Sequence, residues 1–545
     1  MPVVGGPHDP SAWTPLRRTH STIGQSHRDE PKVGMCTLRV GDASKADASV
    51  VEAALLKHPH VRDAVVVPST DTAGESRTVA YLVADLAKLK SLSQRDSRQP
   101  GDQMVDRWNK LYEVTYSRSP AGPSFVGWSS SYTRQAIPDE QMQEWLQATL
   151  ERIRALNPCS VLDIGCGVGL LLQHLAPQCT KYVGTDFSAS AIARLRKWLD
   201  GREDLKHVEL LKRTATEIED LEAGSFDTAI LSSVVQYFPN IDYLLRTLER
   251  IIRLLRPGGR IFLGDVRNLR LLPMFYSAVQ LGKAADSTPV REVMRRASRA
   301  VMQETELAIA PEFFAALPEH LPGISVVEVQ LRRGRAQNEM TRYRYDVVLH
   351  TGERLQPRVV YEPLRWQTEN GFLARVETAL QERRWHALQL CSVPNLRLAR
   401  DFAASELISA SDKTSTVQAL LGELDRRELD GADPETFWQW GELYGYEVSV
   451  GWNSQEPPER FEVRFLDRKR GQISHQTVAP VIPGHVRPWT EYANDPMENR
   501  IGREFILQLP EYLRPLVPEH TIPSEWTLLQ QLPRGSHGDV DWNAL

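Results

Sequence analysis

Apolar and polar positions in residues 159–266 follow two alternating patterns. Short, nearly continuous apolar runs stand at CSVLDIG, KYVGTDFS, HVELLKR, FDTAILSS and GRIFLGDV. Between them lie segments such as ASAIARLRKWLD and NIDYLLRTLERIIRLL, in which apolar residues recur at helical spacing. The runs predict buried strands, and the periodic segments predict amphipathic helices. Because the two kinds of element alternate, we expect a doubly wound, Rossmann-like α/β sheet.

The pattern outside this region indicates further units. Residues 1–39 are rich in Pro, Gly and Ser and are expected to be flexible. Residues 40–90 combine a helical pattern with the runs VRDAVVVPS and RTVAYLVAD, which predicts a small β-α-β-β unit. We expect 104–350 to hold the α/β core with an N-terminal lid, 351–470 to be a C-terminal extension, and 485–545 a last small unit. Within the core, VVEVQLRRG and YRYDVVLH are expected to extend the sheet, the second as an antiparallel edge strand.

Length and composition narrow the class of protein. A chain of 545 residues is too long for one hydrophobic core. Its 65 Lys and Arg against 70 Asp and Glu give a formal charge of -5, which offers no basic field to a nucleic acid. The absence of a signal peptide and of long apolar runs predicts a cytoplasmic protein without membrane association. Five widely spaced cysteines without a C-x-x-C pair fit a reducing compartment and predict no metal site.

Candidate binding chemistry begins at VLDIGCGVG, residues 161–169. An apolar strand there leads into Gly165, Gly167 and Gly169, and glycines allow a sharp turn and close approach of the backbone to a ligand. The G-x-G-x-G spacing differs from the G-x-G-x-x-G of dinucleotide-binding proteins, which argues against NAD. Asp163, at the end of the strand, is placed to accept from a cationic α-amino group.

A second acid stands at the end of the next strand, in GTDFS. In this position an acid typically holds both ribose hydroxyls, and we assign that role to Asp186. Glycines that admit a nucleoside and an acid that binds its ribose predict S-adenosylmethionine (SAM) as the cofactor. The neighbouring Phe187, and Ser233 after the FDTAILSS run, are assigned to the same pocket.

The order VLDIGCGVG, YVGTDFS, FDTAILSSVVQYF and LRPGGRIFLGDV resembles class I SAM-dependent methyltransferases. More narrowly, FVGWSSSYTRQAIPDEQMQEW, NEMTRYRYDVVL and VPNLRLARD resemble the methyltransferase domains embedded in nonribosomal peptide synthetases, over roughly residues 105–468. Where class I enzymes often place an Asp for the adenine amino group, this chain has KRTATEI, with Thr214 and Thr216 near the expected point.

The flanks carry a resemblance of their own. Residues 50–85 resemble the start, and residues 509–545 the end, of the small C-terminal subdomain of adenylation domains, into which the related methyltransferases are inserted. The resemblance implies that the two flanks pair into one small α+β subdomain, split between the ends of the chain. Asp539 stands where adenylation domains usually have a lysine. An acid there would repel phosphate, so we expect the flanks to perform no adenylation.

Methyl transfer needs positioning, exclusion of water and removal of a proton from the acceptor. Tyr237 after VVQ, and Asp265 and Arg267 in GDVRN, stand near strand ends and are the predicted catalytic residues. Trp128, Ser131 and Tyr132 in GWSSSYT precede the core as a lid would, and aromatic faces suit a sulfonium cation. We therefore include Tyr132 in the cofactor site.

The sequence thus predicts a SAM-dependent methyltransferase of secondary metabolism. Its acceptor is expected to be an oxygen or nitrogen of a nonribosomal peptide or polyketide-peptide intermediate, free or bound to a carrier and methylated in trans. A peptide synthetase or a polyketide-peptide hybrid synthase is the expected partner. The alternative is an inactive scaffold or docking module of a peptide-synthetase assembly, although such a module would be free to lose both acids and the glycines.

Overall fold

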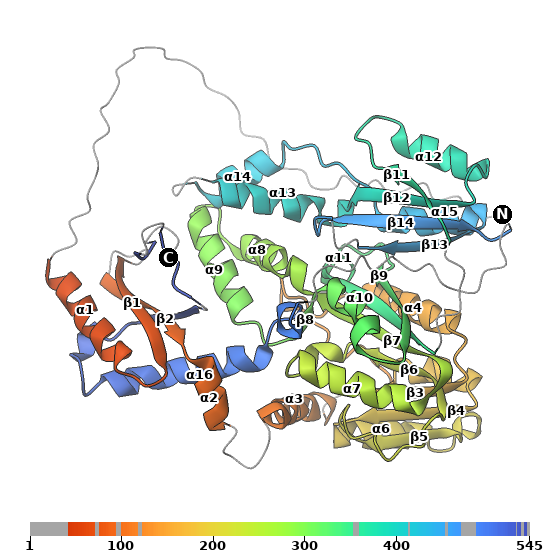
Figure 1. Ribbon diagram of the computed structural model, residues 1–545, viewed down its shortest axis with the longest axis horizontal. Helices are drawn as coiled ribbons and strands as arrows, with labels where there is room; N and C mark the ends of the chain where they lie inside the picture. Colours follow the sequence, from red (N-terminus) through yellow and green to blue (C-terminus); the bar gives the residue numbers. More distant parts are fainter. Residues whose placement is uncertain are drawn as a thin grey trace, which may run out of the picture.

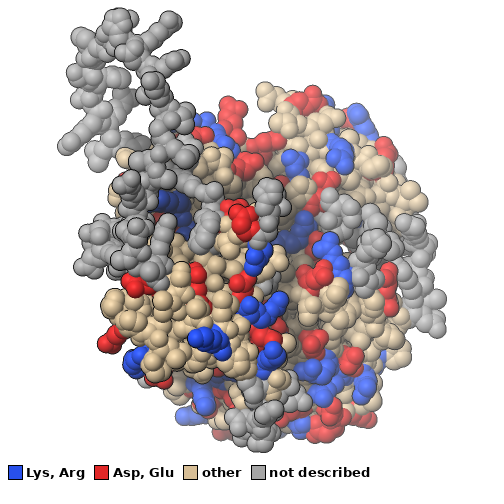
Figure 2. Space-filling view, turned by 60° about the vertical axis from the view of Figure 1, so that its left-hand side comes forward, with Lys and Arg blue, Asp and Glu red and all other residues tan. Residues whose placement is uncertain are grey.

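The computed structural model describes residues 42–70, 76–93, 100–117, 122–352, 359–411, 415–452, 456–469, 487–529, 531–535 and 539–541. The segment expected to be flexible, 1–39, lies outside these residues. The described part of the chain contains three β-sheets, each with its own set of covering helices (Figure 1). On the face drawn in Figure 2, acidic and basic side chains are interspersed rather than gathered by sign.

The central sheet has the strand order β5-β4-β3-β6-β7-β10-β9, with β8 beside β7. Its strands are β3 (Ser160–Ile164), β4 (Lys181–Asp186), β5 (Val208–Lys212), β6 (Phe226–Ser232), β7 (Leu255–Asn268), β8 (Ala308–Ile309), β9 (Ile324–Leu331) and β10 (Arg344–Thr351). The strands from β5 to β7 run parallel, and β10 and β9 are antiparallel to their neighbours. The expected doubly wound, Rossmann-like sheet is therefore present.

One detail of the predicted sheet was wrong. YRYDVVLH forms β10 and is antiparallel as expected, but it lies between β7 and β9 and is not the edge strand. The edge is β9, from the preceding run VVEVQL. All but the first residue of β10 are shielded from solvent. Such burial is typical of an interior strand of a sheet that is covered on both faces.

The helices around this sheet are α3 (Pro100–Ser117), α4 (Asp139–Ala155), α5 (Leu172–Leu175), α6 (Ala189–Leu199), α7 (Ile241–Leu254), α8 (Leu272–Lys283), α9 (Val290–Met302), α10 (Pro311–His320) and α11 (Glu339–Tyr343). Their starts follow ordinary capping chemistry. Ser188 accepts a hydrogen bond from the backbone of Ala191 at the start of α6, and Asn240 does the same for Tyr243 at the start of α7. The caps hold each helix start beside the strand end that precedes it.

A second sheet packs onto the central one and shares its hydrophobic core. It contains β11 (Glu362–Arg365), β12 (Ala387–Pro394), β14 (Arg460–Asp467) and β13 (Tyr446–Gly451), with α12 (Phe372–Gln381), α13 (Leu396–Ala410), α14 (Val417–Leu424) and α15 (Pro434–Tyr444). The backbones come close where a Cβ on Gly451 would lie 2.4 Å from the carbonyl oxygen of Val329. Only glycine fits this approach, which brings the second sheet onto β9.

The third sheet joins the two ends of the described chain (Figure 1). Its strands are β1 (Val61–Thr70), β2 (Ser76–Ala84) and β15 (Glu525–Leu529), and its helices are α1 (Asp42–Leu56), α2 (Leu86–Ser93) and α16 (Pro496–Leu513). Strand β15 runs parallel to β2, with Trp526 opposite Ala80. Side chains from both ends fill one separate core, in which Val51 and Leu55 accompany Phe505 and Leu509.

Candidate functional site

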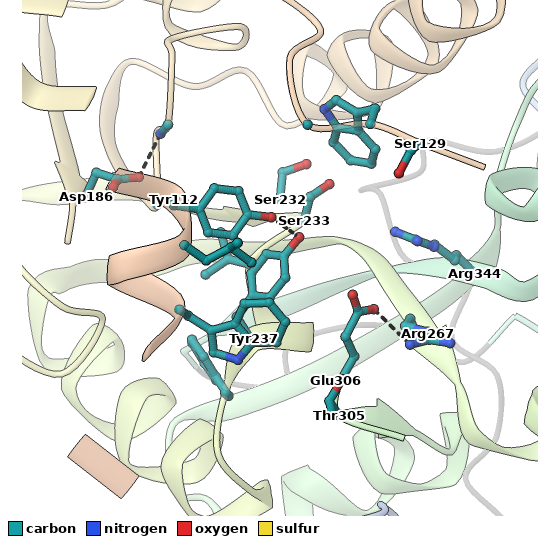
Figure 3. Close-up of a pocket in the computed structure, with 18 of the residues that line it drawn as sticks. Tyr112, Ser129, Asp186, Ser232, Ser233, Tyr237, Arg267, Thr305, Glu306 and Arg344 are labelled. Atoms are coloured by element: carbon teal, nitrogen blue, oxygen red, sulfur yellow. Dashed lines mark hydrogen bonds and ion pairs between the residues drawn. The ribbon is translucent and has the colours of Figure 1, made fainter. Parts of the chain in front are cut away.

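A cavity of about 620 Å³ opens at the carboxyl ends of β3, β4, β6 and β7 (Figure 3). Ligands of open α/β sheets bind at this edge of the sheet. The volume lies within the range of roughly 300 to 1,000 Å³ that is usual for small-molecule sites. The cavity is therefore the candidate active site.

The glycine-rich turn after β3 forms one wall of the cavity. Gly165 and Gly167 both line it and have left-handed backbone angles, φ +74° and +52°. A Cβ on Gly165 would lie 2.4 Å from Val234, so a side chain is excluded there. Gly169 does not line the cavity: a Cβ on it would lie 2.6 Å from Leu195 of α6, so this glycine serves helix packing.

The two acids expected to bind the cofactor both line the cavity and are almost completely buried. Burial raises the pKa of Asp163 to about 7, opposed by a hydrogen bond from the Tyr182 hydroxyl of 2.7 Å. Burial also raises the pKa of Asp186 to about 6, while backbone hydrogen bonds from Ser188 and Gly167 oppose the rise. The Gly167 N–H donates over 2.9 Å to Asp186, which ties this carboxylate to the glycine turn.

The other expected cofactor residues are distributed unevenly around the cavity. Phe187, Ser233 and Thr214 line it. Tyr132 is not among the lining residues, and its ring packs edge-on against Phe275 with centroids 6.3 Å apart. Thr216 also lies away from the lining. Its hydroxyl donates to Tyr243 instead.

Helix α3 supplies an aromatic wall that the sequence motifs did not indicate. Trp108, Tyr112 and Tyr116 all line the cavity from this helix. The Tyr112 hydroxyl donates to Tyr237 over 2.5 Å, and the rings of Trp108 and Tyr237 lie 4.8 Å apart (Figure 3). Burial raises the pKa of Tyr237 to about 12, so this hydroxyl is neutral at physiological pH. The aromatic residues of α3 spaced four apart were the one available signal, and this spacing is also typical of simple packing.

An acid on α3 anchors this wall. Glu113 accepts hydrogen bonds from the Ser190 backbone N–H at 3.0 Å and from the Ser190 hydroxyl at 2.8 Å. It also accepts from the Ser188 hydroxyl at 2.5 Å. These donors belong to the start of α6, where the helix dipole favours a negative charge. Glu113 therefore docks α3 over the strand ends.

The expected lid contributes Trp128 and Ser131 to the lining. Ser131 is held by Glu339, which accepts from its backbone N–H at 2.9 Å and from its hydroxyl at 2.8 Å. The ring of Trp128 lies 4.9 Å from that of Trp145. Trp145, assigned to helix packing by its spacing, is buried and also reaches the cavity.

The end of the cavity nearest β7 is a cluster of charges (Figure 3). Arg267 contacts Glu304 at 2.7 Å and Glu306 at 2.8 Å. Although burial opposes its charge, the two carboxylates hold the pKa of Arg267 above its ordinary value. Glu304 and Glu306 lie in QETELAIA, a stretch without any recognisable motif, and sequence reasoning missed both.

Asp265 is fully buried and is not among the lining residues. Its backbone has φ 67°. Its carboxylate contacts Arg344 at 2.6 Å and accepts from the Ser233 hydroxyl at 3.0 Å. Of the three predicted catalytic residues, Tyr237 and Arg267 thus face the cavity, and Asp265 lies behind Arg344, which lines it.

The residues present fit SAM. Asp186 and Asp163 are the acceptors that ribose hydroxyls and an α-amino group need, and the glycine turn leaves the backbone accessible. Three polar atoms of lining residues, Ser124 Oγ, Trp145 Nε1 and Ser232 Oγ, are buried and have no hydrogen-bond partner among the described residues. Buried polar atoms are normally paired, so these three are available to a ligand.

Comparison with known proteins shows which family of domains contains the segment that lines this cavity. The family model described as "Methyltransferase domain" matches residues 162–261, which include the glycine turn, Asp186 and Tyr237. The chain is 34% identical over 514 residues to the chondramide synthase of Chondromyces crocatus, and the alignment covers 91% of this chain and 13% of the synthase. It is 29% identical over 538 residues to the beauvericin nonribosomal cyclodepsipeptide synthetase of Beauveria bassiana, and that alignment covers 92% of this chain and 16% of the synthetase. The chain therefore spans less than a fifth of the length of these two relatives.

Among solved structures, the N-methyltransferase NodS from Bradyrhizobium japonicum is a neighbour with a TM-score of 0.26 and 18% identity, covering 38% of this chain and 98% of that one. No helix in the described ranges is long and apolar enough to cross a membrane.

The fold and the cavity define a class I SAM-dependent methyltransferase domain with SAM as its cofactor. The domain resembles those embedded in nonribosomal peptide synthetases.

Proposed function

We propose that this protein methylates a nonribosomal peptide or polyketide-peptide intermediate, with an amine nitrogen as the favoured acceptor. The observation that supports nitrogen is the pair of carboxylates, Glu304 and Glu306, at the acceptor end of the cavity. An amine binds as an ammonium ion and must lose a proton before it attacks, and a neighbouring carboxylate serves both needs. A hydroxyl acceptor gains less from this charge.

The cofactor supplies an electrophilic methyl group on a sulfonium when it is bound. Asp186 would hold the ribose hydroxyls and Asp163 the α-amino group, with Gly165 and Gly167 giving close backbone approach. Trp108 and Tyr112 exclude water from this half of the cavity. Their faces, with that of Tyr237, attract a cation.

On the acceptor side, Glu306 would bind the ammonium group and take its proton. Arg267 holds Glu306 in place, since its guanidinium contacts the carboxylate at 2.8 Å. Tyr237 is neutral and would orient the acceptor rather than remove its proton. We assign Asp265 the task of holding Arg344, its ion-pair partner, at the rim of the cavity.

The relatives include a nonribosomal cyclodepsipeptide synthetase, which supports a substrate from peptide biosynthesis. We propose that this substrate is delivered as a thioester and that its acceptor is methylated in trans. The pairing of β15 with β2, together with similarity over 91% of the chain, supports an origin of the flanks in a split adenylation subdomain. Asp539 in place of lysine supports the loss of adenylation.

The test is methyl transfer from SAM to a panel of aminoacyl N-acetylcysteamine thioesters and matched hydroxyacyl thioesters, followed by mass spectrometry. We expect aminoacyl products heavier by one methylene, with the added group on nitrogen. Methylation of the hydroxyacyl series alone would contradict the nitrogen assignment. A protein that neither binds SAM in isothermal titration nor methylates any thioester would be the inactive scaffold.

A further inference from the structure

The short segment that carries Glu304 and Glu306 is held between the central sheet and the C-terminal flank. On one side, β8 pairs with β7, with Ala308 opposite Arg267. On the other side, Ile309 forms a bridge with Ala493, just before α16. The flank thus completes the sheet at the point where the acceptor end of the cavity is built.

One asparagine makes most of this contact. The Asn494 side-chain oxygen accepts from the Ala308 backbone N–H at 2.7 Å, and its amide nitrogen donates to the Glu306 carbonyl oxygen at 2.9 Å. A second amide, that of Asn499 on α16, donates to the Glu304 carbonyl oxygen at 3.0 Å. The two side chains therefore bind the backbone of both acidic residues directly.

The segment has further anchors in the ion pairs of both carboxylates with Arg267 and in a hydrogen bond from the Tyr276 hydroxyl to Glu304 at 2.8 Å. The Glu304 carboxylate accepts from the backbone N–H groups of Thr305 and Glu306, at 2.7 and 2.9 Å, and Leu307 donates to Gln236. Each hydrogen bond to such a loop stabilises its conformation. The ion pairs hold the two carboxylates, whereas the asparagines hold the backbone, so removing the asparagines would let the backbone of Glu306 shift within the cavity wall.

We infer that Asn494 and Asn499 are positioning residues for the acceptor site, so that the C-terminal flank sets the geometry of Glu304 and Glu306. The inference rests on the proposed function. It gives the flank a part in methyl transfer, beyond that of a passive support. The acids assigned to the cofactor lie at the ends of β3 and β4, and their hydrogen bonds go to Tyr182, Ser188 and Gly167.

The experiment compares Asn494→Ala and the near-isosteric Asn494→Asp with the wild-type protein. Alanine removes both hydrogen bonds, whereas aspartate keeps the acceptor for Ala308 and loses the donor to Glu306. We expect the KM for the best aminoacyl thioester of the panel to rise about tenfold in Asn494→Ala. SAM affinity should stay within about twofold, because the cofactor end of the cavity is intact, whereas kcat should fall together with the displacement of Glu306, the proposed proton acceptor. Amide hydrogen exchange in peptide 303–310 should accelerate.

Glu525→Gln is the matched control. Glu525 joins the flank to α9 through Arg295 at 3.0 Å and Arg299 at 2.9 Å, without touching the acceptor segment. It should leave KM and the exchange of 303–310 unchanged. An unchanged KM in folded Asn494→Ala, or an equal loss of SAM affinity and of acceptor binding, would overturn the inference. If the wild-type protein methylates no thioester, the proposed function fails separately from the inference. Amide hydrogen exchange of peptide 303–310 then tests the inference alone. Equal exchange rates in Asn494→Ala and the wild-type protein overturn it, and faster exchange in Asn494→Ala supports it.

Discussion

Tyr112 on α3 and Tyr237 after β6 share a hydrogen bond of 2.5 Å across the cavity. The two residues lie 125 positions apart, and α3 comes before the whole α/β core. The contact connects a helix that lines the cavity with the turn after β6. Through it, the position of α3 and the orientation of the Tyr237 hydroxyl depend on each other.

Replacing Tyr112 by Phe should loosen this connection without emptying the wall. We expect kcat to fall by about three- to tenfold, since one hydrogen bond of about 1 kcal/mol is lost. SAM affinity should change less, because the ring remains. Steady-state kinetics with a thioester acceptor checks this. A Tyr116→Phe control, which keeps the Tyr112–Tyr237 pair, should retain near wild-type kcat, and equal losses in both variants would argue against the role of the pair.

Asp186→Ala should lose SAM binding while the fold is retained. The carboxylate is predicted to bind two hydroxyls, and charged hydrogen bonds contribute about 1.5 to 3 kcal/mol each, so affinity should fall at least about a hundredfold. Isothermal titration with SAM and circular dichroism are the measurements. Asp227→Ala is a control, because this acid caps the start of β3 through Ser160, away from the cavity. Unchanged SAM affinity in Asp186→Ala would move the ribose contact elsewhere.

Asp163 should make the stability of the ligand-free protein depend on pH. Burial raises its pKa from 3.8 to about 7, so folding favours the protonated form. The stability contributed by that proton is present at low pH and is lost as pH rises through about 7. Asp163→Asn should therefore raise the melting temperature more at pH 8 than at pH 5. The same variant should weaken SAM binding, and a pH-independent difference in melting temperature would contradict the assignment.

Binding of SAM to the wild-type protein should follow the same group. An ionised Asp163 is needed for the α-amino contact, so affinity should decline as pH falls below about 7. Titrations between pH 5.5 and pH 8.5, a range of about three units around the shifted pKa, measure this. Because the pKa of Asp186 is raised to about 6, Asp163→Asn should retain only the decline near that lower pH. An unchanged profile in Asp163→Asn, or a flat profile in the wild-type protein, would contradict the assignment.

Glu306→Gln should discriminate between acceptors. The glutamine keeps the shape of the side chain but removes the charge and the proton acceptor, so methylation of aminoacyl thioesters should fall about a hundredfold. Any methylation of hydroxyacyl thioesters should fall less. Glu328→Gln is the matched control, because Glu328 lies on β9 and pairs with His350. This variant should methylate both series of thioesters at the wild-type rate. Equal loss on both acceptor series would remove the case for an amine.

Local patterns determined the central fold. The expected strands appear as β3, β4, β5, β6 and β7, because strand and helix periodicity acts within about ten residues and needs no distant partner. The glycine turn was readable because its spacing stands in one short stretch, and Gly165 and Gly167 adopt the left-handed backbone angles that glycine allows. Asp163 and Asp186 follow from strand ends, which parallel topology brings to one edge.

The periodicity of apolar residues did not determine which side chains outside the central sheet line the cavity. Tyr132 was expected inside and packs against Phe275, whereas Tyr112 and Tyr116 line the cavity from a helix with ordinary amphipathic spacing. Asp265 was expected near the end of a strand but lies within β7, where it has a left-handed backbone and forms an ion pair with Arg344 of β10. The surroundings of this side chain therefore depend on a charge that a distant strand brings beside it.

The sequence by itself determined the type of sheet, the glycine turn and the two acids near the cofactor, because all of these depend on residues close together in the chain. Only the tertiary structure decided the acceptor end. Asn494 reaches Glu306 across 188 residues, and Tyr112 reaches Tyr237 across 125. Contacts over such separations are made when the separate elements pack together, and no local pattern carries them.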